Sequence, residues 1–321
     1  MRAIEVVDGA LEVRDSPQPR PKPAEVLIRV LSAGVNRADL MQRKGHYPAP
    51  TGASEILGLE VAGIIEQVGG EVSRWNVGDE VCALLPGGAY AELCTAHEGS
   101  CLPIPRGVSL RDAGALPEAV FTVWANLFDP KRLFPGETLL VQGGSSGIGS
   151  MAIQMATALG SSVIATAGSA EKCRFCLNLG AEAAFNYHGD WPSEIAGWLG
   201  HARGVDVVLD MVGGDYFAKH LQLMAHGGRV VHIAASKGRE VMADIGLIMR
   251  KRLLITGSTL RGRSVVEKAQ LALSINELVW PLIEAGKIRP LVYQTFPLDR
   301  ANEAHALMES SRHLGKILIL P

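Results

Sequence analysis

The stretch from Thr138 to Gly168 constrains the fold most, because a glycine-rich turn in it joins an apolar run to a helix. It reads TLLVQ, then GGSSGIG, then SMAIQMATALG, and a second apolar run, SVIATAG, follows. Strand, glycine turn, helix and strand in this order are typical of a dinucleotide-binding βαβ unit. We therefore predict that the turn lies against the phosphates of a dinucleotide.

Each glycine of the turn has an expected role. Gly144 is predicted to permit the tight turn out of the strand, while Gly147 and Gly149 keep side chains away where a pyrophosphate and the next strand come close. Backbone N–H groups at the start of the helix would face the phosphates, helped by the helix dipole. The predicted contacts with the cofactor in the turn are Gly144, Ser145, Ser146, Gly147 and Ile148.

The pattern alone is weak, because Ser146 replaces the middle glycine of G-x-G-x-x-G and any α/β protein can have such a turn. The alternation that follows favours the dinucleotide interpretation. Further strands are predicted at Val163–Ala167, Ala183–Tyr187, Val205–Met211, Arg229–Ala234 and Leu253–Ser258. Helices are predicted between them at Ala170–Leu179, Pro192–Leu199, Tyr216–Met224 and Asp244–Arg250. This alternation predicts a doubly wound parallel sheet, a Rossmann domain over residues 122–264.

Ligands of such sheets bind beyond the carboxyl ends of the strands, where Gly168, Ser169, Ala234 and Ala235 are predicted to contact the cofactor. NAD-binding units carry an acidic residue about 20 residues after the turn. The second strand here ends without one.

Lys172 and Tyr187 stand nearby instead, and an ammonium and a hydroxyl attract a 2′-phosphate. We therefore predict NADPH as the cofactor. A solvated helix charge is the alternative for Lys172.

Composition excludes several classes of protein. The 321 residues suffice for two domains, and a net charge of -2 gives no basic surface for nucleic acid. The sequence has no apolar stretch of membrane-spanning length and no signal-peptide core at its start, so we expect a cytoplasmic protein. Five cysteines, an odd number, argue against a disulfide framework.

Residues 1–121 have a different pattern, with short strand-like runs broken by proline and glycine. The expected elements are strands at Arg2–Val7, Val26–Leu31, Val61–Val68, Glu80–Leu84 and Tyr90–Thr95, and a helix at Ala38–Arg43. A helical stretch at Val265–Ala285 and a closing strand at Lys316–Leu320 follow the Rossmann pattern. The C-terminal segment is too short to fold alone, so residues 265–321 are expected to join residues 1–121 in a strand-rich domain.

Several segments in order carry a family resemblance over nearly the whole chain. They are AGVNRAD at 33–39, GHYP at 45–48, GLEVAG at 58–63, VGDEV at 77–81, GAYAE at 88–92, the glycine turn, AGS at 167–169 with Lys172, FNY at 185–187 and GKI at 315–317. With them the chain resembles the zinc-independent quinone oxidoreductases of the medium-chain dehydrogenase/reductase superfamily, and within these the p53-inducible quinone oxidoreductase branch. The resemblance implies a GroES-like catalytic domain, a Rossmann domain and a cofactor between them.

Zinc alcohol dehydrogenases of that superfamily carry a Cys in A-G-V-C and a His in G-H-E, where this chain has Asn36 and Leu59. A catalytic zinc needs three protein ligands, so we expect no metal. Without a Lewis acid to stabilise an alkoxide, alcohol oxidation is disfavoured. A quinone or activated alkene, which delocalises the charge of an added hydride, is the expected acceptor.

The resemblance also implies that Tyr47 lies against the nicotinamide and touches the acceptor, and that Thr122 lies near the cofactor. From its position at the end of a strand, Asn36 is predicted to bind the nicotinamide ribose or the substrate oxygen. Arg261 and Arg263, after the last strand of the Rossmann pattern, are predicted to meet a phosphate or close the site. The alternatives are loop packing for Tyr47, an Asx turn for Asn36 and solvated charges for the arginines.

Three functions remain open on the sequence. The first is an NADPH-dependent quinone oxidoreductase that forms a homodimer or homotetramer through a Rossmann edge strand, either Arg229–Ala234 or Leu253–Ser258. The second is an NADPH-dependent reductase of enones or enoyl thioesters. The third is an NADPH-binding structural or regulatory protein with little turnover.

Overall fold

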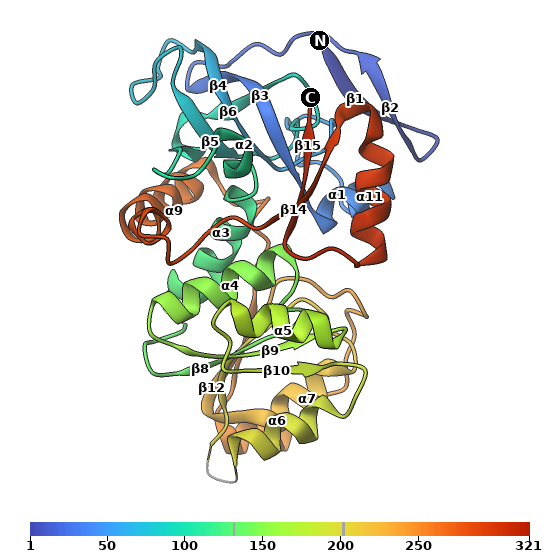
Figure 1. Cartoon of the computed structure of the whole chain (residues 1–321), viewed down its shortest axis with the longest axis vertical. Coiled ribbons are helices and arrows are strands. Elements are labelled where there is room, and N and C mark those ends of the chain that lie inside the picture. The colour runs from blue at the N-terminus through green and yellow to red at the C-terminus, as the bar shows by residue number, and fades with distance from the viewer. Residues whose placement is uncertain (131, 201–202) are drawn as a thin grey trace. The chain divides into compact units, whose positions relative to one another are not determined.

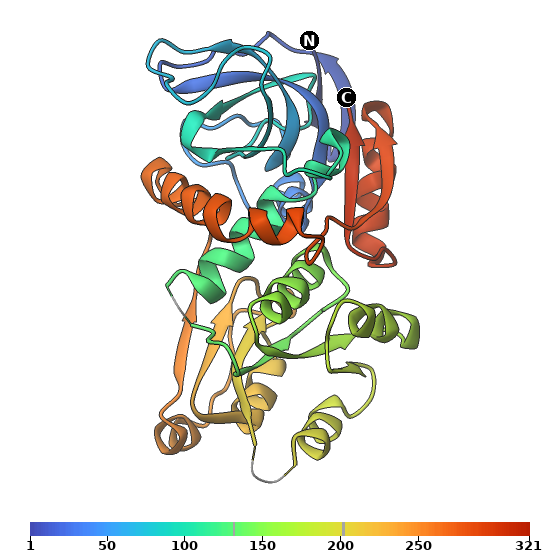
Figure 2. The ribbon, with the colours of Figure 1, turned by 60° about the vertical axis from the view of Figure 1, so that its left-hand side comes forward.

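The computed structural model describes residues 1–130, 132–200 and 203–321. These residues form two compact units, which Figures 1 and 2 show in two views. Unit 1 contains Met1–Phe121 and Arg261–Pro321, and unit 2 contains Thr122–Leu260. Arg261, at the start of the second part of unit 1, hydrogen-bonds through its side chain to Pro86 and Gln42 of the same unit. The domain boundary predicted after residue 264 stays a prediction.

Unit 2 is built on a six-stranded parallel sheet with the order β10-β9-β8-β11-β12-β13. The strands are β8 (Thr138–Val141), β9 (Ser162–Ala167), β10 (Ala183–Asn186), β11 (Val205–Asp210), β12 (Met224–His232) and β13 (Leu254–Gly257). The predicted doubly wound parallel sheet is thus confirmed. Its first strand, β8, lies in the middle, so the glycine-rich turn leaves the centre of the sheet.

Helices cover both faces of this sheet (Figure 1). The helices α4 (Gly147–Ala158) and α5 (Ala170–Asn178) lie on one face. The other face carries α6 (Trp191–Leu199), α7 (Tyr216–Leu223) and α8 (Ile245–Lys251). Trp191, Ile195, Phe217 and Leu221 pack there on strand residues such as Val208 in one buried cluster, and burial of this apolar surface holds the helices on the sheet.

Strand β12 differs from the prediction of Arg229–Ala234. It begins at Met224 and ends at His232, with an irregular register against β11 between Val205 and Val207. The early start of the strand was not predicted because glycine, which is rare in strands, occupies positions 227 and 228. The order of the sheet also makes β12 an interior strand, so the prediction that Arg229–Ala234 is an edge is wrong.

Unit 1 contains a mixed, mostly antiparallel sheet with the order β14-β15-β3-β4-β5-β7, and β6 also pairs with β3. Its strands are β3 (Glu25–Val35), β4 (Glu60–Val68), β5 (Glu80–Leu84), β6 (Leu93–His97), β7 (Cys101–Pro103), β14 (Val292–Pro297) and β15 (Lys316–Leu320). A separate two-stranded sheet pairs β1 (Arg2–Val7) with β2 (Ala10–Asp15). The predicted strand-rich, GroES-like character of this part is confirmed.

The C-terminal segment returns to the first part of the chain, as predicted. Strand β15 pairs antiparallel with β3, and Ile317 lies opposite Val35. The helix predicted over Val265–Ala285 is divided into α9 (Val265–Leu278) and α10 (Trp280–Glu284). Pro281 in the first turn of α10 explains the break, because proline has no N–H to continue a helix.

The remaining helices of unit 1 are short, except for one near the C-terminus that has no counterpart in the prediction. They are α1 (Arg37–Arg43), α2 (Leu110–Ala113) and α11 (Ala301–Ser310), while α3 (Pro117–Val123) spans the division between the units. In the described part of the chain, no helix is long and apolar enough to cross a bilayer.

Candidate functional site

The glycine-rich turn connects β8 to α4 in unit 2. Gly143 has a φ of +72°, which is the left-handed region that favours glycine. The tight turn therefore depends on Gly143, and the role predicted for Gly144 is corrected. Ser146 caps α4, because its Oγ accepts a hydrogen bond from the Gly149 N–H at 3.0 Å.

Gly144 and Gly149 are needed for close packing. A Cβ on Gly144 would lie 2.8 Å from Ala165 Cβ and 2.9 Å from Cys176 Sγ. A Cβ on Gly149 would lie 2.3 Å from the Gly143 carbonyl oxygen. The absence of both side chains lets the start of α4 approach β8 and β9 closely, as a turn that binds phosphates requires.

The other predicted turn residues lie at the start of α4. Ser145 is buried, and Ser146, Gly147 and Ile148 are half-buried. The unpaired N–H groups of a first helical turn and the positive end of the helix dipole attract anions. These residues therefore fit a dinucleotide pyrophosphate.

At the end of β9, the Tyr187 ring lies over Gly168. A Cβ on Gly168 would come within 2.4 Å of the Tyr187 hydroxyl oxygen. Ser169 caps α5 by accepting a hydrogen bond from the Lys172 N–H at 3.2 Å. Partial burial lowers the pKa of the Lys172 ammonium. The structure thus brings together four predicted residues around the start of α5: Gly168, Ser169, Lys172 and Tyr187.

The remaining predicted cofactor contacts of unit 2 lie in segments other than the glycine-rich turn and the start of α5. Ala234 and Ala235 are exposed and follow the carboxyl end of β12. Thr122, in α3, is buried, and its carbonyl accepts a hydrogen bond from Asn126 Nδ2 at 2.8 Å. Their contacts with a cofactor remain predictions.

In unit 1, Asn36 belongs to a buried ion-pair cluster. The Lys316 ammonium pairs with Glu60 Oε1 and donates to Asn36 Oδ1 at 2.7 Å. Asn36 Nδ2 donates to Glu60 Oε1 at 2.8 Å and to the Gly34 carbonyl at 3.3 Å. Both N–H groups of the Asn36 amide are thus occupied, and only acceptor capacity on Oδ1 remains.

The Glu60 carboxylate is satisfied on both oxygens, because Oε2 accepts the Glu118 backbone N–H at 2.9 Å. Sequence reasoning did not pair Glu60 with Lys316, which is 256 positions away. Two isolated charges of opposite sign within apolar strands were the available signal, because buried charges need partners.

The Arg261 side chain binds the segments around Tyr47. Its guanidinium donates to the Pro86 carbonyl at 2.7 Å, to Gln42 Oε1 at 2.8 Å and to the Tyr47 carbonyl at 3.3 Å. It also lies 5.3 Å from the centre of the Tyr47 ring. Burial lowers the pKa of Arg261 and raises that of Tyr47. Arg261 is buried and is therefore not a solvated charge. Arg263 is half-buried.

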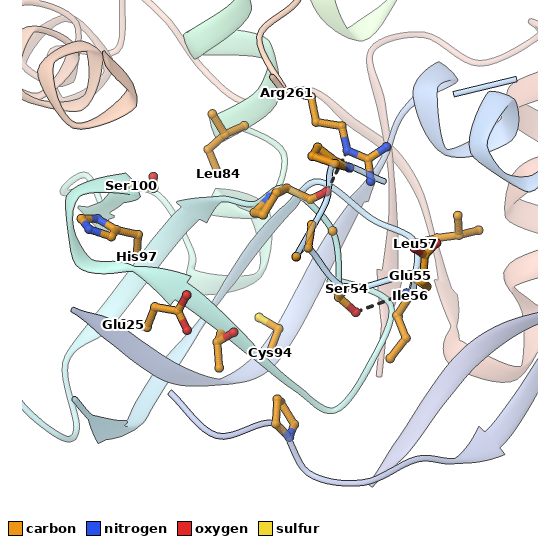
Figure 3. Close-up of a pocket in the computed structure, with 18 of the residues that line it drawn as sticks. Glu25, Ser54, Glu55, Ile56, Leu57, Leu84, Cys94, His97, Ser100 and Arg261 are labelled. Carbon is orange, nitrogen blue, oxygen red and sulfur yellow. Dashed lines mark hydrogen bonds between the residues drawn. The ribbon is translucent and has the colours of Figure 1, made fainter. Parts of the chain in front are cut away.

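Arg261 also lines a pocket of about 910 Å³ in unit 1. Figure 3 shows the labelled side chains that surround it, among them Ser54, Ile56, Leu84, Cys94 and His97. Its size is within the range of small-molecule sites. Gln42 and Arg261 lie in its wall, and Arg261 also donates to the Tyr47 carbonyl.

The residues at the positions of the zinc ligands do not fit a metal. Leu59 is apolar and buried, and the Lys316 ammonium already supplies the positive charge between Asn36 and Glu60. Among the described residues, His, Cys, Asp and Glu form no group of three or more that could hold a metal ion.

Comparison with known proteins identifies the class first. Residues 22–106 match the alcohol dehydrogenase GroES-like domain, and residues 147–274 match the zinc-binding dehydrogenase family. The mouse (Mus musculus) quinone oxidoreductase is 34% identical over 329 residues, covering 100% of this chain and 98% of the relative. The two matched domains define a medium-chain dehydrogenase/reductase. Within that superfamily, the chain belongs to the quinone oxidoreductase family.

Solved structures agree with this assignment. The Escherichia coli quinone oxidoreductase complexed with NADPH is 28% identical, with a TM-score of 0.88 and coverage of 100% of both chains. An NAD-dependent alcohol dehydrogenase is 32% identical with the same TM-score and coverage. An enoyl reductase, CurK, also matches, at 27% identity and a TM-score of 0.84 over 99% of this chain and 98% of its own. The chain is therefore an oxidoreductase with a domain that binds a nicotinamide cofactor.

Proposed function

We propose that this protein is an NADPH-dependent quinone oxidoreductase that works without a metal. The observation that carries the choice of NADPH is the group at the end of β9. No carboxylate ends that strand, and Gly168 leaves room for the Tyr187 hydroxyl beside the start of α5. A 2′-phosphate would meet that hydroxyl, the Lys172 ammonium and the capped N-terminus of α5.

NADPH, when bound, supplies a hydride from its reduced nicotinamide ring. The chain would hold it through Gly144–Ile148, Gly168, Ser169, Lys172 and Tyr187, with Thr122, Ala234 and Ala235 as further contacts. Of the two roles predicted for Asn36, its geometry favours the ribose, because a ribose hydroxyl can donate to the remaining lone pair of Oδ1. A substrate oxygen would need an N–H donor, and both are occupied.

On the acceptor side, we propose that Tyr47 contacts the quinone. Arg261 supports this role, because it holds both the backbone and the ring of Tyr47. The same bonds argue against Arg261 as a phosphate ligand, while Arg263 is left as the candidate for that contact. Exclusion of water and orientation of the acceptor are what this part of the chain has to provide.

We further propose that the protein forms a homodimer or homotetramer through β13. This strand ends the Rossmann sheet, and Leu254 and Ile255 on it are exposed. Helix α8, which precedes β13 in the chain, buries none of its residues, and Met249 is 71% exposed. An edge with apolar side chains is suited to pairing with a second copy.

The function is tested by NADPH oxidation against a panel of acceptors. The panel contains 1,2- and 1,4-quinones, enones and an enoyl thioester, and each is measured with NADPH and with NADH. Rapid turnover of quinones with NADPH is the expected result. Preference for the thioester or an enone would favour the second function, which the similarity to CurK supports. Tight NADPH binding without turnover of any acceptor would favour a structural or regulatory protein.

A further inference from the structure

A chain of buried polar groups runs beneath the glycine-rich turn, and sequence analysis gave it no role. It connects the carboxyl ends of β8, β9 and β11 with α7. Its members are Gln142, Thr166, Asp210 and His220, all with 0% exposure. Polar groups buried this deeply are costly unless they are paired, so their arrangement requires an explanation.

The direction of each hydrogen bond follows from the turn. The Gly143 N–H can only donate, and Thr166 Oγ1 accepts from it at 3.3 Å. The Thr166 hydroxyl then donates to Gln142 Oε1. The Gln142 amide nitrogen, 3.0 Å from His220 Nε2, is therefore the donor in that contact.

The hydrogen bonds end at His220, and the Asp210 carboxylate lies beyond it. Because His220 Nε2 accepts, the proton of the neutral ring is on Nδ1, which lies 3.8 Å from Asp210 Oδ2, too far for a hydrogen bond, and has no other hydrogen-bond partner among the described residues. Asp210 also binds His232 Nδ1 at 3.0 Å and accepts the backbone N–H groups of Val212 and Gly213 at 2.8 and 3.2 Å. From the Gly143 N–H to His220 Nε2, each hydrogen bond therefore has one direction.

We infer that this hydrogen-bond relay, Gly143–Thr166–Gln142–His220, fixes the orientation of the phosphate-binding turn, and that Thr166, Gln142 and His220 are positioning residues for the cofactor. Gly143 is the residue in the left-handed conformation, so the peptide that the relay holds is the one where the chain turns toward α4. The inference rests on the proposed function, because it assumes that the turn binds NADPH.

The test compares isosteric and conservative variants. Thr166→Val removes the hydroxyl and leaves the Gly143 N–H and Gln142 Oε1 unpaired, whereas Thr166→Ser keeps it. His220→Leu removes the acceptor for Gln142, whereas the Gln side chain of His220→Gln can still accept. His226→Gln, at an exposed histidine of the same unit, is the matched control.

The dissociation constant for NADPH is measured by nicotinamide fluorescence, and amide hydrogen exchange is followed in the peptide 142–150 of the cofactor-free protein. We expect Thr166→Val and His220→Leu to raise that constant about tenfold, as an unpaired buried group would, and to speed exchange. Thr166→Ser, His220→Gln and the control should stay near the wild type. If His220→Leu does not fold, the Thr166 pair provides the same comparison.

A merely structural role would lower the urea midpoint of Thr166→Val without changing the NADPH constant of the folded protein or the exchange of this peptide. That result would overturn the inference about the relay alone. Failure of the wild type to bind NADPH would instead contradict the proposed function. In that case, unchanged amide exchange of peptide 142–150 in the variants would overturn the inference about the relay as well.

Discussion

Lys172 is the residue on which the preference for NADPH depends most. Its ammonium would pair with the 2′-phosphate, which NADH lacks. We predict that Lys172→Ala raises the KM for NADPH about tenfold and leaves that for NADH nearly unchanged, since one partly exposed ion pair is lost. Steady-state kinetics with both cofactors check this. Lys219→Ala removes a surface ion pair with Asp215 in the same unit and is the control. An equal effect on both cofactors would contradict the role of Lys172.

His220 makes stability depend on pH. Burial lowers its pKa to about 4, and Asp210 opposes this effect only in part. The unfolded chain binds a proton near the ordinary pKa of about 6.5 and the folded protein does not, so stability is lost as pH falls from about 6.5 toward 4. The groups that face the ring are Asp210 on β11, His232 on β12 and Lys219 on α7.

We predict that this histidine alone costs the wild type about 2 kcal/mol of unfolding free energy between pH 7 and pH 5. Urea unfolding of wild type and His220→Gln at the two pH values measures the difference. The variant should lose less stability than the wild type by about that amount, whereas His226→Gln should behave like the wild type. Parallel losses in all three proteins would show that His220 is not the group responsible.

At the scale of elements, β13 decides the assembly. Its side chain Leu254 is 52% exposed. Leu254→Glu would place a charge in the proposed interface, and we predict that it yields monomers in light scattering while the wild type is a dimer or tetramer. Leu273→Glu, on an equally exposed residue of α9, should leave the assembly unchanged. A monomeric wild type would contradict the proposed interface.

The elements of unit 2 could be predicted from sequence because local signals coincide there. Each apolar run is bounded by glycine or by a helix cap, as at Ser146 and Ser169. Unit 1 was harder. Strand β14 and helix α11 were missed, because the exposed Tyr293 interrupts the apolar pattern and no side chain caps the start of α11.

The candidate site was predictable where one local segment makes it, as in the turn of residues 143–149. It was not predictable where partners are far apart in the chain. Arg261 and Gln42 are separated by 219 positions, and Gln142 and His220 by 78. A sequence read alone gives residue types, and only the fold shows which donor meets which acceptor.

For the molecule as a whole, we expect quinone reduction to proceed without a bound metal ion. Lys316 provides the positive charge at Asn36 and Glu60, so a divalent ion there would be repelled. We predict that a strong chelator leaves quinone reduction unchanged and that elemental analysis of the purified protein finds no stoichiometric zinc. One zinc ion per chain, or activity lost to the chelator and restored by zinc, would refute this.

Selective binding of NADPH by the Rossmann unit is tested most directly by a fluorescence titration of the purified protein with NADPH and with NADH. We predict saturable binding of NADPH with a dissociation constant at least about tenfold below that for NADH. Equal or tighter binding of NADH, or no binding of either nucleotide, would contradict it.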